Sequence, residues 1–146
     1  MEAKLYQMPL AFGTLMQRSK ELPAVNLGTS IAQNIFLIVS TKYKEHRFDP
    51  EYGCEIWERD FETITSPMTW QEQINRSIRK CLARYEPRLE NVAVDTVISE
   101  QEYQHPTTGV RSVKKRVTAN VRGIIKSTGE PFICSPKLFI SPISLD

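Results

Sequence analysis

The feature that most constrains the fold is a change of hydrophobic period at Pro87. Before it, apolar side chains recur at helical spacing and stack on one face of a long helix; they are Trp70, Ile74, Ile78, Cys81, Leu82 and Tyr85. Because Pro87 has no N–H and biases Glu86 away from helical angles, the helix must end there. After it, apolar and polar residues alternate, as in β-strands. The chain is therefore expected to run from helices into strands.

An earlier helix is predicted by a second apolar stripe, formed by Ile31, Ile35, Ile38 and Val39. Ser30 and Gln33 have the spacing of a capping box at its start, and Thr69 and Glu72 have the same spacing at the start of the long helix. A polar loop is expected over 42–53, followed by a short helical turn near 55–62. Residues 1–28 show no clear period, which is typical of an arm that lies across a domain or is held by a partner.

Three strands are predicted after Pro87. The first contains Val92, Val94 and Ile98, the second contains Val117, Ala119 and Val121, and the third lies near 132–140. A loop over about 100–112 joins the first two. Prolines at 131, 136 and 142 cannot donate to a ladder, so the third strand is expected at an edge. The predicted fold class is α+β, with N-terminal helices packed on a C-terminal three-stranded antiparallel sheet. The residues expected to share its core are Ile31, Ile35, Ile38, Ile74, Ile78, Leu82, Val94, Val117, Ala119 and Val121.

The 146 residues are 40% hydrophobic and 25% charged, enough for one core. We expect an N-terminal arm over 1–28 and a single domain over 29–146. No run reaches the roughly 18 apolar residues that cross a bilayer, so no membrane insertion is expected, and the first residues do not resemble a secretory signal. The three cysteines are odd in number and widely spaced, which favours reduced, buried thiols in a cytoplasmic protein.

Charge is unevenly distributed. Residues 45–62 contain seven acidic side chains, whereas every charged side chain within residues 111–126 is basic. Two interpretations remain open: each run is a solvated surface, or the two runs dock onto different protein partners. The net charge of +2 is too small to predict a nucleic-acid partner.

Nothing in the sequence predicts catalysis. The two histidines, His46 and His105, have no ligand or triad spacing, and no nucleotide, metal or hydrolase motif occurs. We therefore expect no catalytic residue, metal, cofactor or small-molecule substrate. Paired carboxylates within 45–62 leave a glycosidase compatible by residue type, but no apolar pocket that would raise a carboxyl pKa can be inferred.

Glu86 and Arg88 flank the proline turn and allow two interpretations. In one, Arg88 caps the last carbonyls of the long helix and Glu86 pairs with Arg84 or Arg88 on the surface. In the other, the two charges form a fixed, two-pronged feature for recognition.

Three segments in order carry a family resemblance: residues 30–35 at the start of the first helix, residues 45–53 with Phe48-Asp49-Pro50, and Tyr85-Glu86-Pro87-Arg88. Over about 28–140 the chain resembles the baseplate wedge family shared by contractile phage tails and type VI secretion, whose secretion-system member is called TssE. Lys44 stands where the family has a glycine, His46 precedes Arg47, and Tyr52 replaces a phenylalanine.

The resemblance implies a structural, non-enzymatic baseplate component of a contractile injection machine. Its implied partners include other wedge subunits, contacted by Glu86, Pro87 and Arg88. The loop residues Phe48, Asp49 and Pro50 are also expected to take part in protein interaction. Sheath proteins are the second class of partner, and they would add a strand at the edge that carries Leu138 and Ile140. The implied location is cytoplasmic, in a baseplate near the inner membrane. Two alternatives are a cell-wall hydrolase and a stand-alone regulatory binding module.

Overall fold

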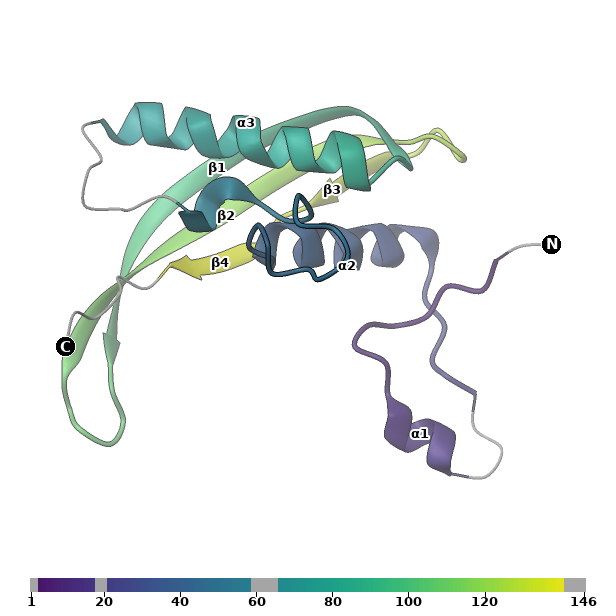
Figure 1. The fold of residues 1–146 in the computed structure, drawn as a ribbon, viewed down its shortest axis with the longest axis horizontal. Helices are drawn as coiled ribbons and strands as arrows, with labels where there is room; N and C mark the ends of the chain where they lie inside the picture. The colour runs from purple at the N-terminus through teal and green to yellow at the C-terminus, as the bar shows by residue number, and fades with distance from the viewer. Residues whose placement is uncertain (1–2, 18–20, 59–65, 141–146) are drawn as a thin grey trace.

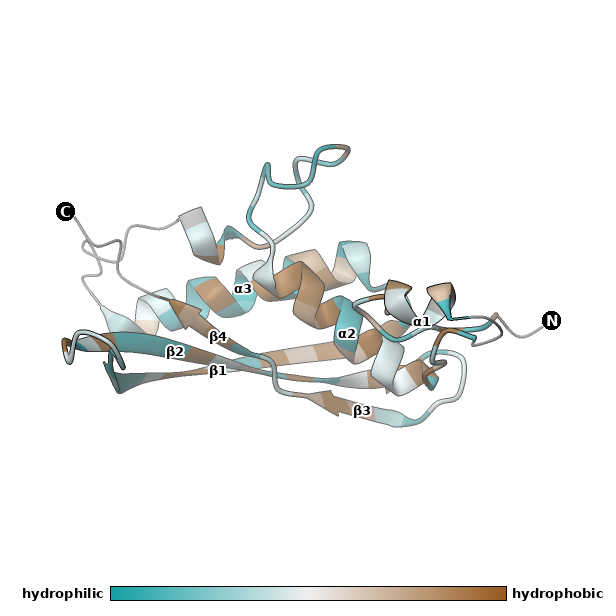
Figure 2. Ribbon diagram, turned by 90° about the horizontal axis from the view of Figure 1, so that it is seen from below, coloured by the Kyte–Doolittle hydropathy of each residue, from teal (hydrophilic) through white to brown (hydrophobic). Residues whose placement is uncertain are grey.

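The computed structural model describes residues 3–17, 21–58 and 66–140 and shows an α+β fold (Figure 1). The helical elements are α1 (Phe12–Met16), α2 (Leu27–Ser40), the short 3₁₀ helix η1 (Glu55–Glu58) and α3 (Pro67–Tyr85). The strands are β1 (Leu89–Gln104), β2 (Arg111–Ile125), β3 (Pro131–Cys134) and β4 (Lys137–Ile140). Both long helices lie on the same side of one antiparallel sheet (Figure 2).

The two long helices are confirmed, but neither begins at its predicted capping box. Helix α2 starts at Leu27, where the Oδ1 atom of Asn26 accepts a hydrogen bond of 2.8 Å from the N–H of Thr29. Helix α3 starts at Pro67, which suits a first helical position because its missing N–H would have no partner there. The Ser30 and Thr69 spacings therefore lie inside helices.

The sheet has four strands, not the predicted three. Strand β2 lies in the middle, with β1 on one side and β3 and β4 in succession on the other. Both short strands share one register against β2, in which Val121 pairs with Cys134 and Val117 with Leu138. Pro136 separates them: its carbonyl accepts a 3.0 Å bond from Ala119, but it has no N–H to return. The predicted edge position is confirmed, and Pro142 lies outside the described residues.

The β1–β2 hairpin is longer than predicted. Residues 100–104 and 111–112 belong to the strands, and only 105–110 form the loop, with Gly109 at a φ of 68°. Polar cross-strand neighbours such as Glu100 and Lys115 pair in this part of the ladder. Because these strand ends carry few apolar residues, hydrophobic period did not reveal them. The end of the hairpin projects beyond the helices (Figure 1).

The predicted core is confirmed for nine of its ten members, which are buried; Val94 is partly buried against them. The segment after the polar loop adds Cys54 and Ile56 to this core. Only a glycine fits at position 53, where the chain enters the core: at its φ of 120°, a Cβ atom would lie 2.5 Å from the carbonyl oxygen of Thr41. The short helical turn is confirmed as η1, and the rest of its predicted range lies outside the described residues.

The first residues form an arm at one side of the molecule (Figure 1). Tyr6 and Ala24 make an antiparallel bridge, and the N–H of Met8 donates a 3.2 Å hydrogen bond to Gln33 on α2. Phe12 and Met16 of α1 are 65% and 88% exposed. The bridge therefore holds two parts of the arm together, and the bond from Met8 links the arm to α2.

Candidate functional site

The end of α3 forms a charged junction with α2. Glu86 follows the last helical residue, and its N–H bonds to the carbonyl of Leu82 at 2.9 Å. Pro87 then reverses the chain, which brings Arg88 back over the Glu86 carboxylate. The Nε and Nη2 atoms of Arg88 donate to the two carboxylate oxygens at 2.6 and 2.7 Å. This is a bidentate, charge-assisted pair, the strongest type of side-chain hydrogen bond.

Two polar residues of α2 complete the junction. The Nδ2 atom of Asn34 donates to Glu86 at 2.8 Å and to the carbonyl of Tyr85 at 3.2 Å. The Nη1 atom of Arg88 donates to the hydroxyl of Ser30 at 3.1 Å. Ser30 and Asn34 are four residues apart and therefore lie on one face of α2. We call these four residues, Ser30, Asn34, Glu86 and Arg88, the helix junction.

The burial of Glu86 shows that the Glu86–Arg88 ion pair is not a surface pair. The Glu86 side chain is fully buried, whereas the Arg88 side chain is 34% exposed. The hydrogen bond to Glu86 raises the pKa of Arg88 against the opposing effect of its partial burial. The bonds described use three of the five guanidinium N–H donors, so an exposed part of Arg88 keeps donors for another acceptor. Pro87 is exposed beside it.

The predicted loop residues lie next to the junction. Tyr85 donates through its hydroxyl to Asp49 at 2.9 Å, and its ring meets that of Tyr52 edge to face at 4.9 Å. Burial, followed by the nearby Glu86 charge, raises the pKa of Tyr52. Phe48 is 87% exposed at the loop's outer side, and Pro50 is also exposed. The structure thus joins Asp49 of the loop to Tyr85, the residue that precedes the motif, whereas Glu86 itself is buried.

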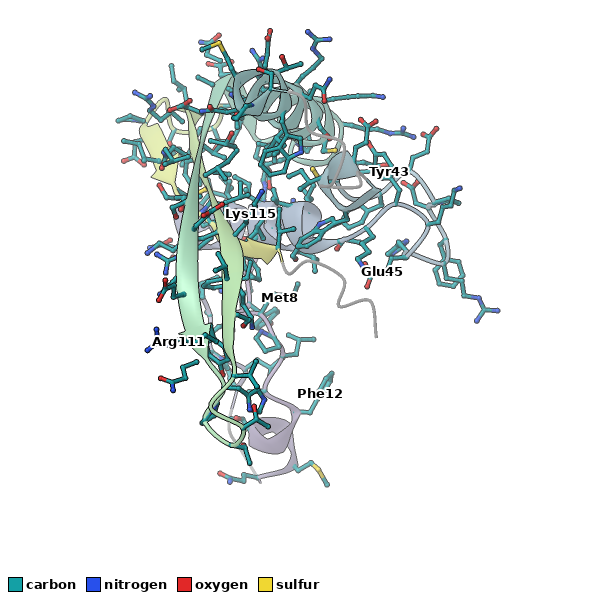
Figure 3. All side chains as sticks on the ribbon, turned by 90° about the vertical axis from the view of Figure 1, so that its left-hand side faces the viewer. Met8, Phe12, Tyr43, Glu45, Arg111 and Lys115 are labelled. Carbon is teal, nitrogen blue, oxygen red and sulfur yellow. The ribbon has the colours of Figure 1, made fainter. Side chains whose placement is uncertain are left out.

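The same loop encloses a cavity of about 340 Å³ against α3, lined by Tyr43, Lys44, Pro50, Glu51, Lys80, Cys81, Arg84 and Tyr85. The loop stands out from the helix side of the sheet, where Figure 3 labels Tyr43 and Glu45. The Cys81 thiol donates to the carbonyl of Gly53 at 2.7 Å. Hydrogen bonds with Cys54 and then with Tyr43 lower the pKa of Cys81 to about 7, although burial opposes them. Cys54 and Cys81 are free and buried, and Cys134 is free and partly buried.

Leu138 and Ile140 are not placed for contact with a partner. They are 4% and 3% exposed and belong to the core under the helices, which corrects their predicted role. The exposed side chain of this strand is Phe139, at 53%. Because side chains alternate along a strand, the sequence pattern does not predict which of the two sets faces the helices.

The described part of the chain offers no cluster of side chains that could bind a metal ion, because no three of its His, Cys, Asp or Glu side chains gather closely enough. Glu51 pairs with Arg84, and His46 Nδ1 accepts from the N–H of Asp49 at 3.2 Å, so these side chains hold the loop together. Among the described helices, none has the length and apolarity needed to span a membrane.

The sequence profile of the family named "Baseplate wedge protein gp25" matches residues 25–130. This chain belongs to the gp25 baseplate wedge family. Baseplate wedge protein gp25 of Enterobacteria phage T4 is 32% identical over 74 residues, which cover 51% of this chain and 54% of the phage protein. The chain therefore matches about half the length of this relative. The family supports a structural role in the baseplate of a contractile machine.

Two solved structures are similar to this chain. A protein from Geobacter sulfurreducens, described as a candidate tail lysozyme, superposes with a TM-score of 0.58 at 20% identity, covering 83% of this chain and 97% of that one. A chain of a type VI secretion baseplate complex gives a TM-score of 0.46 at 22% identity, covering 77% and 90%. At these identities the likeness concerns the fold alone. The N-terminal arm up to residue 24 precedes the range that matches the gp25 family.

Sequence reasoning did not find Ser30 and Asn34 as members of the junction. One sequence feature could have indicated them, because Ser30 and Asn34 are polar, lie four residues apart and border the apolar stripe of α2. A buried helix face that carries such a pair needs polar partners. Those partners are more than fifty positions away in the sequence, so only the folded arrangement identifies them.

Proposed function

We propose that this protein is a non-catalytic subunit of a contractile injection baseplate that binds other wedge subunits and nucleates the sheath. The observation that carries the proposal is the open backbone edge of β3 and β4, in a chain of the gp25 family. An unpaired edge is a template for strand addition. A cytoplasmic location, in a baseplate close to the inner membrane, belongs to the same proposal.

The alternation of hydrogen bonds along β4 determines which backbone N–H and C=O groups are available to a partner strand. Since Ala119 bonds to Pro136, the residues in the same alternation, including Leu138 and Ile140, direct their backbone groups toward β2. Lys137 and Phe139 then direct their N–H and C=O groups away from the sheet. An incoming sheath strand would pair with these outward groups while the buried side chains stay in the core.

Wedge binding is assigned to the surface formed by the loop and the exposed side of Arg88. Phe48 offers an apolar side chain, and Arg88 offers guanidinium donors held in place by Glu86. Arginine and exposed aromatic side chains are both enriched at protein interfaces. Glu86 acts in this scheme by positioning Arg88, because its own carboxylate is fully buried.

The test uses two substitutions at one position. Phe139→Pro removes an outward N–H and is compatible with an edge strand, so pairing with β2 should survive. Phe139→Ala removes the same ring but keeps the N–H. The sheath hypothesis predicts that sheath assembly, counted by fluorescence microscopy in cells, is lost with proline and retained with alanine.

Two controls keep the result interpretable. Circular dichroism and thermal melting must show both variants folded, and wedge partners must still copurify with both. Sheaths of normal number and length with a folded Phe139→Pro protein would contradict strand addition at this edge. Deletion of residues 136–146 is a poorer test, because it would remove the buried Leu138 and Ile140 and open the core.

A further inference from the structure

The side of the sheet opposite the helices presents apolar and basic side chains together. Helices α2 and α3 lie on one side of the sheet, and no helix of the described residues lies on the other (Figure 2). Cross-strand register places six side chains on this uncovered side: Val97, Arg116, Arg122, Ile133, Lys137 and Phe139. We call these six residues the open face.

The apolar members of the open face are strongly exposed. Val97, Ile133 and Phe139 are 51%, 71% and 53% exposed. They come from three strands, so they are spread over one surface and not along one strand. Arg116 pairs with Phe139 across β2 and β4, and its guanidinium lies 5.4 Å from the ring centre, which is a cation–π contact.

The charged members of the open face are basic. Arg116 and Arg122 belong to the middle strand, and Lys137 begins β4. Arg122 pairs with Ile133, and Lys137 pairs with Thr118, whose other neighbour is Val97. Basic groups and apolar groups are therefore interleaved, and the acidic residues Glu90 and Asp95 lie on the same side.

This pattern favours an acidic protein helix over other occupants. Adjacent strands lie about 4.8 Å apart, so the path from β1 across β2 to β4 is about 10 Å wide, close to the diameter of a helix. A helix with an apolar stripe flanked by carboxylates would cover the exposed side chains and meet the basic ones. Nucleic acid would meet exposed aliphatic side chains between the charges, and it would also meet Asp95.

We propose that the open face is a docking surface for an acidic amphipathic helix of a partner protein. The helix would pack on the sheet opposite α2 and α3 and give a helix–sheet–helix sandwich. This surface is distinct from the β3–β4 edge, because side chains contact the partner here, whereas backbone groups do so at the edge. The inference does not depend on sheath nucleation.

The experiment uses the full chain and three synthetic probes. The first probe is a helical peptide with leucines at i, i+3, i+4 and i+7 flanked by glutamates. The second has lysines in place of the glutamates, and the third is a short DNA duplex. Backbone amide NMR shifts and fluorescence anisotropy report where and how tightly each binds. Binding of the acidic peptide, with shifts concentrated at Val97, Thr118 and Phe139, is the expected result.

A pair of charge variants supplies the matched control. Arg122→Glu should weaken binding of the acidic peptide by at least about tenfold, because like charges then face each other. Lys115→Glu makes the same type of change on β2, but Lys115 pairs with the buried Ile140 and lies on the helix side (Figure 3). This control should change the affinity by less than about twofold.

The other outcomes overturn the proposal. These are equal binding of both peptides, preferential binding of the duplex, shifts confined to another surface, or no binding by the acidic peptide. An equal loss of affinity with Lys115→Glu would show that net charge alone governs the interaction. None of these outcomes bears on the sheath test, which depends on the outward N–H of Phe139.

Discussion

The helix junction and the open face are both built around arginine, but their surroundings differ. At the junction, Arg88 bonds to a fully buried carboxylate and to Ser30, so its charge is neutralised within the chain. On the open face, Arg116 contacts an exposed ring, and Arg122 is exposed beside Ile133. The first region connects two helices, whereas the second presents charge and apolar surface to solvent.

This difference shows how a recognition motif can also serve folding. Removal of one partner of a buried ion pair leaves an uncompensated charge, which costs far more than loss of a surface pair. The Glu86–Arg88 junction is therefore expected to affect the free energy of unfolding as well as binding. The open face should affect binding with little change in stability. Substitutions in the two regions can test this contrast directly.

The largest effect is expected from Glu86→Ala. It leaves Arg88 and Asn34 without their common acceptor, and it should lower the free energy of unfolding by about 3 kcal/mol, the lower end for breaking a buried pair because Arg88 is partly hydrated. Urea denaturation followed by circular dichroism measures this. A loss below about 0.5 kcal/mol would remove the contrast between the two regions.

A separate core variant shows whether Glu86→Ala affects wedge binding only through stability. Ile78→Ala, in the middle of α3, should cost roughly 2–5 kcal/mol by creating a cavity at a fully buried position. Ile78 belongs to neither the junction nor the loop. If both folded variants lose wedge partners equally in a pull-down, the effect of Glu86 on binding is a stability effect. Selective loss with Glu86→Ala supports its role in positioning Arg88.

Asn34→Ala should give an intermediate effect. It removes two hydrogen bonds, one to a buried carboxylate and one to the carbonyl of Tyr85. We expect a loss of about 1.5–3 kcal/mol, the range for hydrogen bonds to charged groups. Thermal melting of this variant beside the unchanged protein measures it. Equal melting temperatures would show that the hydrogen bonds of Asn34 in the helix junction do not stabilise the fold.

Local patterns predicted much of the fold and less of the site. Helical period identified α2 and α3 and nearly all the predicted core, because a buried helix face must be apolar wherever its partner lies. Helix starts were misplaced because capping spacings also occur within helices, as at Ser30. The polar end of the hairpin was read as loop because its strands lack an apolar face.

Tertiary contacts explain the remaining errors. The burial of Glu86 depends on Asn34 and Ser30, which no local pattern connects to it. Leu138 and Ile140 were expected at an interface, but they pack in the core, because alternation does not say which face the helices cover. Pro136 was read as part of one strand, although its missing N–H divides the ladder.

The smallest change in stability is expected from Arg122→Ala. Arg122 lies on the solvent side of β2, and its cross-strand neighbours are Ala93 and Ile133, so its removal breaks no buried pair. The free energy of unfolding should change by less than about 0.5 kcal/mol, as for most exposed positions. Urea denaturation beside Glu86→Ala makes the comparison within one experiment. A loss approaching that of Glu86→Ala would mean that Arg122 has a structural role like that of Arg88, and the open face would then no longer be a surface free for recognition.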